Sequence, residues 1–265
     1  YPVYEALAVV LFPAVAVVLV RFLLRACNRR NLPLAGTLIL LSVANLVFHL
    51  SVMGWLALPP SSALYAALGL IVMVECVMAG RVIPAFTMSV TPGLKIAVPP
   101  WLERGALATT FVALALWVFA PGGWITFAAL AAAAVLQGAR MLHWHSMVSR
   151  KKPILWILHA AYAWIPLGLA LLALAQPGWV LVSVGVHALA VGATGGLIIG
   201  MLTRTARGHT GRPLQVSRAE VLAYALVMAA AVLRVLVPMV APQWYSHALV
   251  CAAAAWHCPG WDRCF

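Results

Sequence analysis

The chain has 265 residues, of which 65% are hydrophobic and 8% are charged, and its mean hydropathy is +1.03. A soluble fold of this length cannot bury so much apolar surface, so the composition excludes a soluble globular protein and predicts a polytopic membrane protein. The net charge of +12 would suit nucleic acid, but Lys and Arg fall in short loops between apolar runs. This placement argues against binding to nucleic acid and indicates that the partner of the chain is the lipid bilayer.

About nine apolar runs follow one another, each near the ~20 residues that a helix needs to cross a bilayer. They cover residues 4–24, 32–58, 62–80, 104–121, 123–142, 154–175, 178–203, 219–238 and 241–257. The sequence therefore predicts an all-α transmembrane helix bundle in a single domain, 1–265, with an atypical tail over 258–265. Between runs three and four, residues 81–104 contain four prolines, and we expect this segment to lie along the membrane surface rather than as one regular helix.

Basic residues alternate across the runs. Arg and Lys follow runs one, three, five and seven, whereas the intervening turns at 59–62, 121–123, 176–178 and 238–243 contain none. Arg140 is grouped with the basic loop after run five. By the positive-inside rule, the basic loops are predicted to be cytoplasmic and Tyr1 to lie on the outer side.

The run over 178–203 has one helix face made of small residues and also contains a histidine. Gly192, Gly196 and Gly200 recur every four residues, which predicts close packing against a neighbouring helix. His187 lies in the same run, and an imidazole in hydrocarbon is a functional hypothesis because it is expensive without a partner. The alternative is a histidine that is hydrogen-bonded to a neighbouring helix.

Two histidines are predicted to share one depth. His49 and His187 each lie 17 residues from the cytoplasmic end of their run, or ~25 Å above it at the helical rise. Two imidazoles from facing helices suit a six-coordinate haem iron. The alternative is a polar contact between helices, since His49 shares a stripe with Ser42 and Asn45.

A second group of histidines is predicted near the cytoplasmic boundary. His143 and His145 end run five, His159 begins run six, and His209 follows run seven. Imidazole nitrogens bind copper, iron and zinc alike, so the group suits a metal without identifying it. His159 is the strongest candidate because Pro166 is expected to kink its helix, whereas an H-x-H pair at a membrane edge is more often solvated.

Charged residues near the spans have two interpretations each. Glu75 is expected to pair with Arg81, and the functional alternative is proton delivery. Arg81 and Arg204 lie at inner helix ends, where a guanidinium could hold a haem propionate or simply set the orientation. The spacing of the cysteines matches no zinc site.

Three segments carry a family resemblance: GRVIPAFT at 80–87, HWHSMVSRKKPILWILHAAYAWIPLGLAL at 143–171, and HALAVGATGGLIIGMLTRTARGHTGRPL at 187–214. Together they resemble the NnrS family of bacterial inner-membrane proteins, which is associated with the response to nitric oxide. The resemblance implies twelve spans, so about three are expected to precede Tyr1, and it implies haem, copper and tolerance of nitrosative stress during denitrification. The family's recurrent positions correspond to His143, His159, His187, His209, Arg81, Arg204 and Arg212.

The resulting hypothesis is an inner-membrane haem and copper protein that responds to nitric oxide and protects against nitrosative stress. Its predicted metal ligands are His49, His143, His159, His187 and His209, and its predicted cofactor contacts are Arg81, Arg204 and Arg212. A membrane electron donor is a further possible partner. Two alternatives stay open: a permease without metal, which predicts a broken helix in run seven, and an oxidoreductase that converts nitric oxide and depends on Glu75 and His159.

Overall fold

A computed structural model describes residues 2–26 and 32–256, and every regular element within them is a helix. Tyr1 and the predicted tail over 258–265 lie outside these residues. The chain divides into two units, Tyr1–Val74 and Glu75–Phe265. The first unit contains α1 (Pro2–Arg25), α2 (Leu32–Val52) and the first part of α3 (Pro60–Ser89). The rest of α3 begins the second unit, which carries the candidate site.

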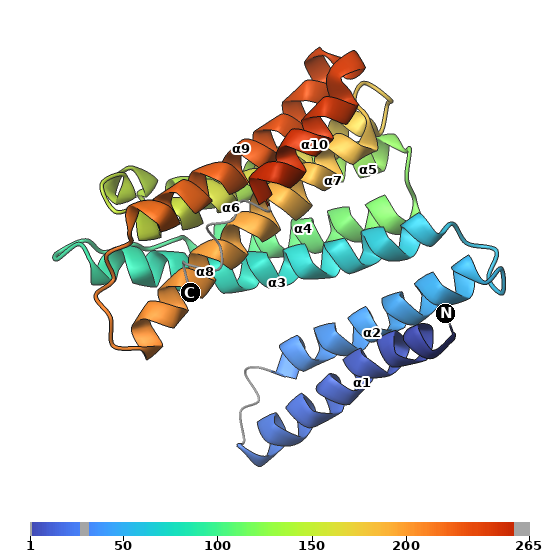
Figure 1. Cartoon of the computed structure of the whole chain (residues 1–265), viewed down its shortest axis with the longest axis horizontal. Coiled ribbons are helices and arrows are strands. Elements are labelled where there is room, and N and C mark those ends of the chain that lie inside the picture. Colours follow the sequence, from blue (N-terminus) through green and yellow to red (C-terminus); the bar gives the residue numbers. More distant parts are fainter. Residues whose placement is uncertain (1, 27–31, 257–265) are drawn as a thin grey trace. The chain divides into compact units, whose positions relative to one another are not determined.

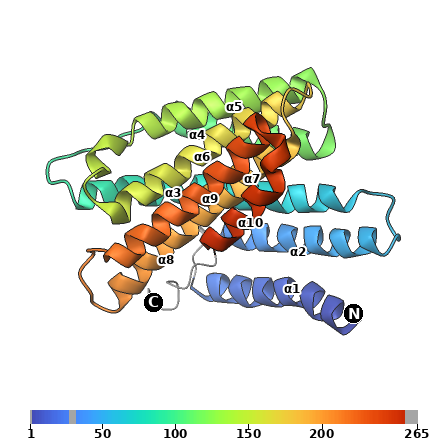
Figure 2. The same ribbon diagram turned by 45° about the horizontal axis from the view of Figure 1, so that its top comes forward.

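The second unit is built around α6. Its elements are α4 (Pro100–Phe119), α5 (Trp124–Leu142), η2 (Ser146–Ser149), α6 (Pro153–Ala175), α7 (Val182–His187), the π-helix η3 (Ala188–Gly195), α8 (Gly196–His209), α9 (Arg218–Val240), η4 (Pro242–Trp244) and α10 (Tyr245–Trp256). Helix α6 packs against α5 and also against the continuous element formed by α7, η3 and α8 (Figure 1). Helix α10 folds back along α9 (Figure 2).

The all-α, polytopic class is confirmed. Among the described residues, 7 helices are long and apolar enough to cross a membrane. The predicted span over 241–257 is shorter than expected, because α10 contains only 12 residues and rises ~18 Å, against a hydrocarbon core of ~30 Å.

The prediction for residues 81–104 is wrong in its first part, because α3 continues through Pro84 to Ser89. A proline inside a helix removes one backbone hydrogen bond, but membrane helices tolerate this when neighbouring elements cover the site. Both Ile83 and Pro84 are buried, so packing holds the helix together across the proline. Helix α6 also runs without interruption past Pro166, which is partly buried.

The predicted glycine face of run seven packs as expected against α6. A Cβ atom on Gly192 would lie 2.4 Å from Cγ of Trp164, and one on Gly196 would lie 2.6 Å from Cβ of Ala161. Gly200 has a similar limit at 2.7 Å from a methyl carbon of Leu158. Only glycine allows these two helices to approach so closely.

We therefore expect Gly196→Val to lower the free energy of unfolding by about 2 kcal/mol, because the added methyl groups overlap Ala161. Gly208→Val is the matched control on the same helical element, since its Cβ would meet no atom within 4 Å. Thermal unfolding of the detergent-solubilised protein measures both. Equal melting temperatures for the two variants would contradict the packing.

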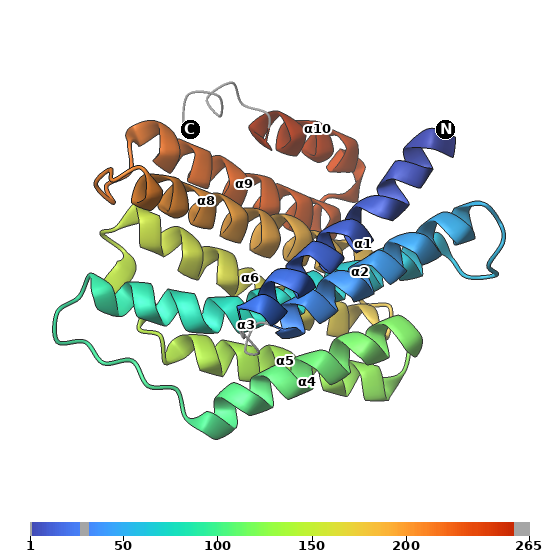
Figure 3. The ribbon, with the colours of Figure 1, turned by 90° about the horizontal axis from the view of Figure 1, so that it is seen from below.

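The loops with basic residues meet at one end of the second unit, which we call the basic end. The α3–α4 loop, the start of α6 and the α8–α9 loop all lie at the left of Figure 3. Their cations are exposed, among them Arg104, Lys151, Lys152, Arg212 and Arg218. This arrangement agrees with the charge alternation that the sequence predicted. Arg140 is the exception, because it is completely buried.

Candidate functional site

Arg140 is the centre of a buried polar network. Its Nε donates to Oε2 of Glu103 at 2.7 Å, and its Nη2 forms the second bond of a bidentate ion pair with the same carboxylate. Its Nη1 donates to the carbonyl oxygen of Cys76 at 2.9 Å and to the hydroxyl of Tyr162 at 3.0 Å. One guanidinium thus connects α3, α4, α5 and α6, with its charge compensated.

Gln137 extends this network. The Tyr162 hydroxyl donates to Oε1 of Gln137 at 2.5 Å, and Nε2 of Gln137 donates to the Thr110 hydroxyl at 2.9 Å. Gly80 makes room for the guanidinium, since a Cβ there would lie 1.7 Å from Nη2 of Arg140. We call Arg140, Glu103, Gln137, Tyr162 and Thr110 the Arg140 network, which connects α4, α5 and α6 through side-chain hydrogen bonds.

Sequence reasoning missed this network. It grouped Arg140 with the basic loop after run five, whereas the side chain points into the bundle. The available signal was Gln137 one helical turn earlier, which puts two polar side chains on one face of a span. Glu103 was a second signal, because it is one of only 5 acidic residues in the chain.

His159 lies beside this network, and its hydrogen bond to Thr87 favours one tautomer of the ring. Its side chain is buried, and Nε2 lies 3.0 Å from Oγ1 of Thr87. The Thr87 hydroxyl already donates its hydrogen to the carbonyl of Ile83 at 2.9 Å. With this bond in place Thr87 accepts from Nε2–H of His159, and this tautomer leaves the lone pair of the ring on Nδ1. That nitrogen is buried and has no hydrogen-bond partner among the described residues.

Trp144 connects His159 to the Arg140 network. Its ring is 4.5 Å from that of Tyr162 and 6.5 Å from that of His159, measured between centroids. The indole is fully buried, and within the described chain its Nε1–H also lacks a partner. A hydrogen-bond donor and an acceptor are thus left unpaired in one aromatic cluster, and such groups are expensive to bury.

A second set of unpaired polar atoms surrounds the π-helix. His187 is half-buried and ends α7, where the π-helix begins. The Glu75 carboxyl lies next to the Thr194 hydroxyl of the π-helix, yet Oε2 of Glu75 and Oγ1 of Thr194 form no hydrogen bond with any described residue. π-Helical segments are often found at functional sites.

The expected pairing of Glu75 with Arg81 is not formed. The ion pairs within residues 2–26 and 32–256 are Arg140–Glu103 and Arg207–Glu220. Side chains six residues apart on a helix point about 120° apart, so Arg81 projects to a different face and is exposed.

The other predicted histidine ligands are dispersed. His143 and His209 are exposed, and Nδ1 of His143 is 2.9 Å from the carbonyl oxygen of Ala139. His49 lies in the first unit against Phe48, whereas His187 belongs to the second. Nowhere in the described chain do three His, Cys, Asp or Glu side chains form a group that could hold a metal ion. The metal roles of His49, His143, His159, His187 and His209 stay predictions.

The three predicted cofactor arginines differ sharply. Arg81 and Arg212 are exposed, whereas Arg204 is only 8% exposed. The guanidinium carbon of Arg204 stacks 3.7 Å from the ring centroid of Phe86, and its Nη1 is buried without a hydrogen bond to any described residue. Of the three, Arg204 therefore has a buried, unpaired donor that can bind an anion. Contacts of all three with a haem propionate stay predictions.

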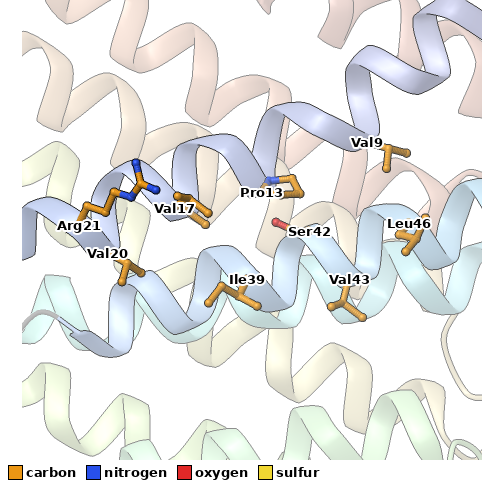
Figure 4. Close-up of a pocket in the computed structure, with 10 residues that line it drawn as sticks. Val9, Pro13, Val17, Val20, Arg21, Ile39, Ser42, Val43 and Leu46 are labelled. Carbon is orange, nitrogen blue, oxygen red and sulfur yellow. The ribbon is translucent and has the colours of Figure 1, made fainter. Parts of the chain in front are cut away.

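The first unit contains an apolar groove of about 550 Å³ between α1 and α2 (Figure 4). Pro13 and Val17 of α1 face Ile39 and Val43 of α2 along it, and Arg21 lies at one end (Figure 4). No histidine or cysteine is among the residues that line the groove. It offers no metal ligand.

Comparison with known proteins gives one result. A family model described as NnrS protein matches residues 2–259. No curated protein and no solved structure matches the chain.

Proposed function

The chain belongs to the NnrS family, and on this premise we propose that it is a haem- and copper-containing protein of the bacterial inner membrane that responds to nitric oxide and protects against nitrosative stress. The 7 helices of the described residues that are long and apolar enough to cross a membrane support this proposal. The single observation that carries the proposal is the state of His159, whose Nδ1 lone pair is buried and unpaired.

A metal-binding histidine commonly donates its second ring N–H to an oxygen, which fixes the tautomer and orients the ring. The bond from Nε2 of His159 to Thr87 has this form. Trp144 packs beside the ring of His159, and Tyr162 packs against Trp144. These contacts support Nδ1 of His159 as the best-prepared metal-binding nitrogen in the described chain.

The rest of the proposed centre follows the family resemblance. His187 would hold haem in the second unit, His49 stays a predicted haem ligand of the first unit, and the residues near the basic end, including His143 and His209, would hold copper or contact the haem edge. Haem iron needs only one or two protein ligands, so it does not require a group of three ligating side chains. Nitric oxide is small and apolar, and it enters from the bilayer.

The protective role is tested in cells. A strain that lacks the protein is grown with a nitric oxide donor after complementation with the wild type, His159→Ala or His145→Asn. We expect the wild type and His145→Asn to restore growth, because His145 is exposed and asparagine tolerates its left-handed φ of 54°. His159→Ala should fail to restore it at equal expression. A wild-type protein that gives no protection would contradict the proposed function.

A second function, conversion of nitric oxide, is favoured by Glu75. A reductase needs a proton path, and this carboxyl is held inside the second unit without a cation partner among the described residues. We expect Glu75→Gln to lower the rate of nitric oxide consumption by about 100-fold, the effect of losing a proton-transfer group. Consumption at the wild-type rate in the Gln variant would remove the oxidoreductase hypothesis.

The permease alternative predicted an interrupted helix with free backbone groups near the middle of run seven. The π-helix Ala188–Gly195 changes the hydrogen-bond spacing there, but the whole segment Val182–His209 stays one helical element. We therefore do not propose transport.

A further inference from the structure

A cleft at the basic end combines positive charge with an apolar wall. It has a volume of about 500 Å³ and is lined by Val90, Lys151, Lys152, Pro153, Ile154, Arg204, Pro213, Leu214, Gln215 and Val216. We call it the basic cleft. It lies between the α3–α4 loop, the start of α6, α8 and the α8–α9 loop, so every element that forms it belongs to the second unit.

Arg204 gives the basic cleft its unpaired charge. More than nine-tenths of this residue is buried, and its Nη1 has no hydrogen-bond partner in the described part of the chain. Phe86 covers the face of its guanidinium. The chain supplies little negative charge to offset it, since it has 17 Lys and Arg against 5 Asp and Glu, and Glu103 and Glu220 are occupied by Arg140 and Arg207. A buried cation without a counter-ion favours an anion from outside the chain.

The start of α6 adds to this field. Lys152 and Pro153 line the cleft at the point where the helix begins, and no side chain caps the helix there. The positive end of the helix dipole favours an anion there, and phosphate is a common one. Lys151 is exposed at the same rim.

The walls of the cleft are fixed by the chain itself. Nζ of Lys152 donates to the carbonyl oxygen of Val90 at 2.7 Å, which holds the α3–α4 loop. Nη1 of Arg207 donates to the carbonyl oxygen of Pro213 at 3.2 Å, which holds the α8–α9 loop. Neither bond involves Arg204, so its Nη1 stays without a partner and its positive charge stays available to a ligand.

We propose that the basic cleft binds a phosphate group, supplied by an anionic phospholipid or by free phosphate. The cleft lies where the apolar helices end, and Pro213, Leu214 and Val216 offer an apolar surface beside the cations. Basic pockets between membrane helices suit lipid headgroups for these reasons. A haem propionate is the competing anion, but no histidine is among the residues that line the cleft. The inference does not depend on haem, and so goes beyond the proposed function.

The test uses the full chain, purified in detergent and stripped of lipid. Dioleoylphosphatidylglycerol, dioleoylphosphatidylcholine and inorganic phosphate are titrated separately, with native mass spectrometry to detect bound lipid and thermal unfolding to detect stabilisation. We expect phosphatidylglycerol to bind more tightly than phosphatidylcholine. Inorganic phosphate that stabilises the protein and displaces phosphatidylglycerol would identify free phosphate as the source, and phosphate without effect would identify the lipid.

Variants locate the site. Arg204→Gln should weaken phosphatidylglycerol binding about 10-fold or more, because it removes charge-assisted hydrogen bonds. Lys151→Gln is exposed and should fold normally, and it should weaken binding about 5-fold through the loss of one surface charge. Arg104→Gln, at the same end but outside the cleft, should bind as the wild type does.

Wild-type affinity for phosphatidylglycerol in both Arg204→Gln and Lys151→Gln would overturn the proposal, as would a wild type that binds neither lipid nor phosphate. Loss of haem from Arg204→Gln with unchanged lipid binding would also overturn it, in favour of a propionate. Should Arg204→Gln fail to fold, Lys151→Gln carries the test, because its side chain lies at the surface. None of these results depends on nitric oxide protection, so the two proposals fail separately.

Discussion

Glu103→Gln is expected to destabilise the folded protein by about 3 kcal/mol, because it leaves the guanidinium of Arg140 charged and buried without its counter-ion. We place the loss at the lower end of the range for buried pairs, since Glu103 keeps 34% of its side chain exposed. The free energy of unfolding in mixed detergent micelles measures the loss. Arg104→Gln removes a charge from the adjacent exposed residue and should change stability by less than about 0.5 kcal/mol.

The double variant Glu103→Gln, Arg140→Met separates the cause from a general packing defect. Removing Arg140 also removes the uncompensated charge, so the double variant should be more stable than Glu103→Gln alone. An additive loss, or a Glu103→Gln variant as stable as Arg104→Gln, would contradict the central role of this ion pair.

His159→Ala is expected to lower the metal content of the purified protein by 10-fold or more, because it removes the best-prepared nitrogen. Thr87→Val keeps the ligand and should lower the metal affinity by about 10-fold, with a smaller loss of metal content than in His159→Ala, since it removes only the acceptor that fixes the tautomer. Haem is quantified from its pyridine complex and copper by elemental analysis, so the metal that is lost identifies what His159 binds. His145→Asn is the control. Wild-type haem and copper in His159→Ala would contradict the ligand role.

Much of the fold could be predicted from the sequence because spans depend on local properties. Length and apolar composition predicted α4, α5, α6 and α9 to within about four residues and missed the ends of α2 and α8 by about six. The four-residue spacing of Gly192, Gly196 and Gly200 predicted close packing against a neighbouring helix, which is α6. The end of α3 was predicted wrongly because the tolerance of Pro84 depends on burial by other helices. Such tertiary contacts leave no pattern in the residues beside the proline.

The candidate site was less predictable for a related reason. The sequence singled out His159 for its place near Tyr162 and Pro166. The hydrogen bond that orients its ring is formed with Thr87, which is 72 residues away. Arg140 resembled an ordinary orientation charge, because nothing near it in the sequence reveals that Glu103 faces it. Depth placed His49 and His187 at one level, but depth does not establish which helices are neighbours.

The most direct measurement is the optical spectrum of the purified full-length protein, recorded as isolated, after dithionite and after nitric oxide. The account predicts a Soret band that shifts on reduction and shifts again when nitric oxide is added. A preparation that protects cells against nitric oxide but shows no Soret band, iron or copper would contradict the account.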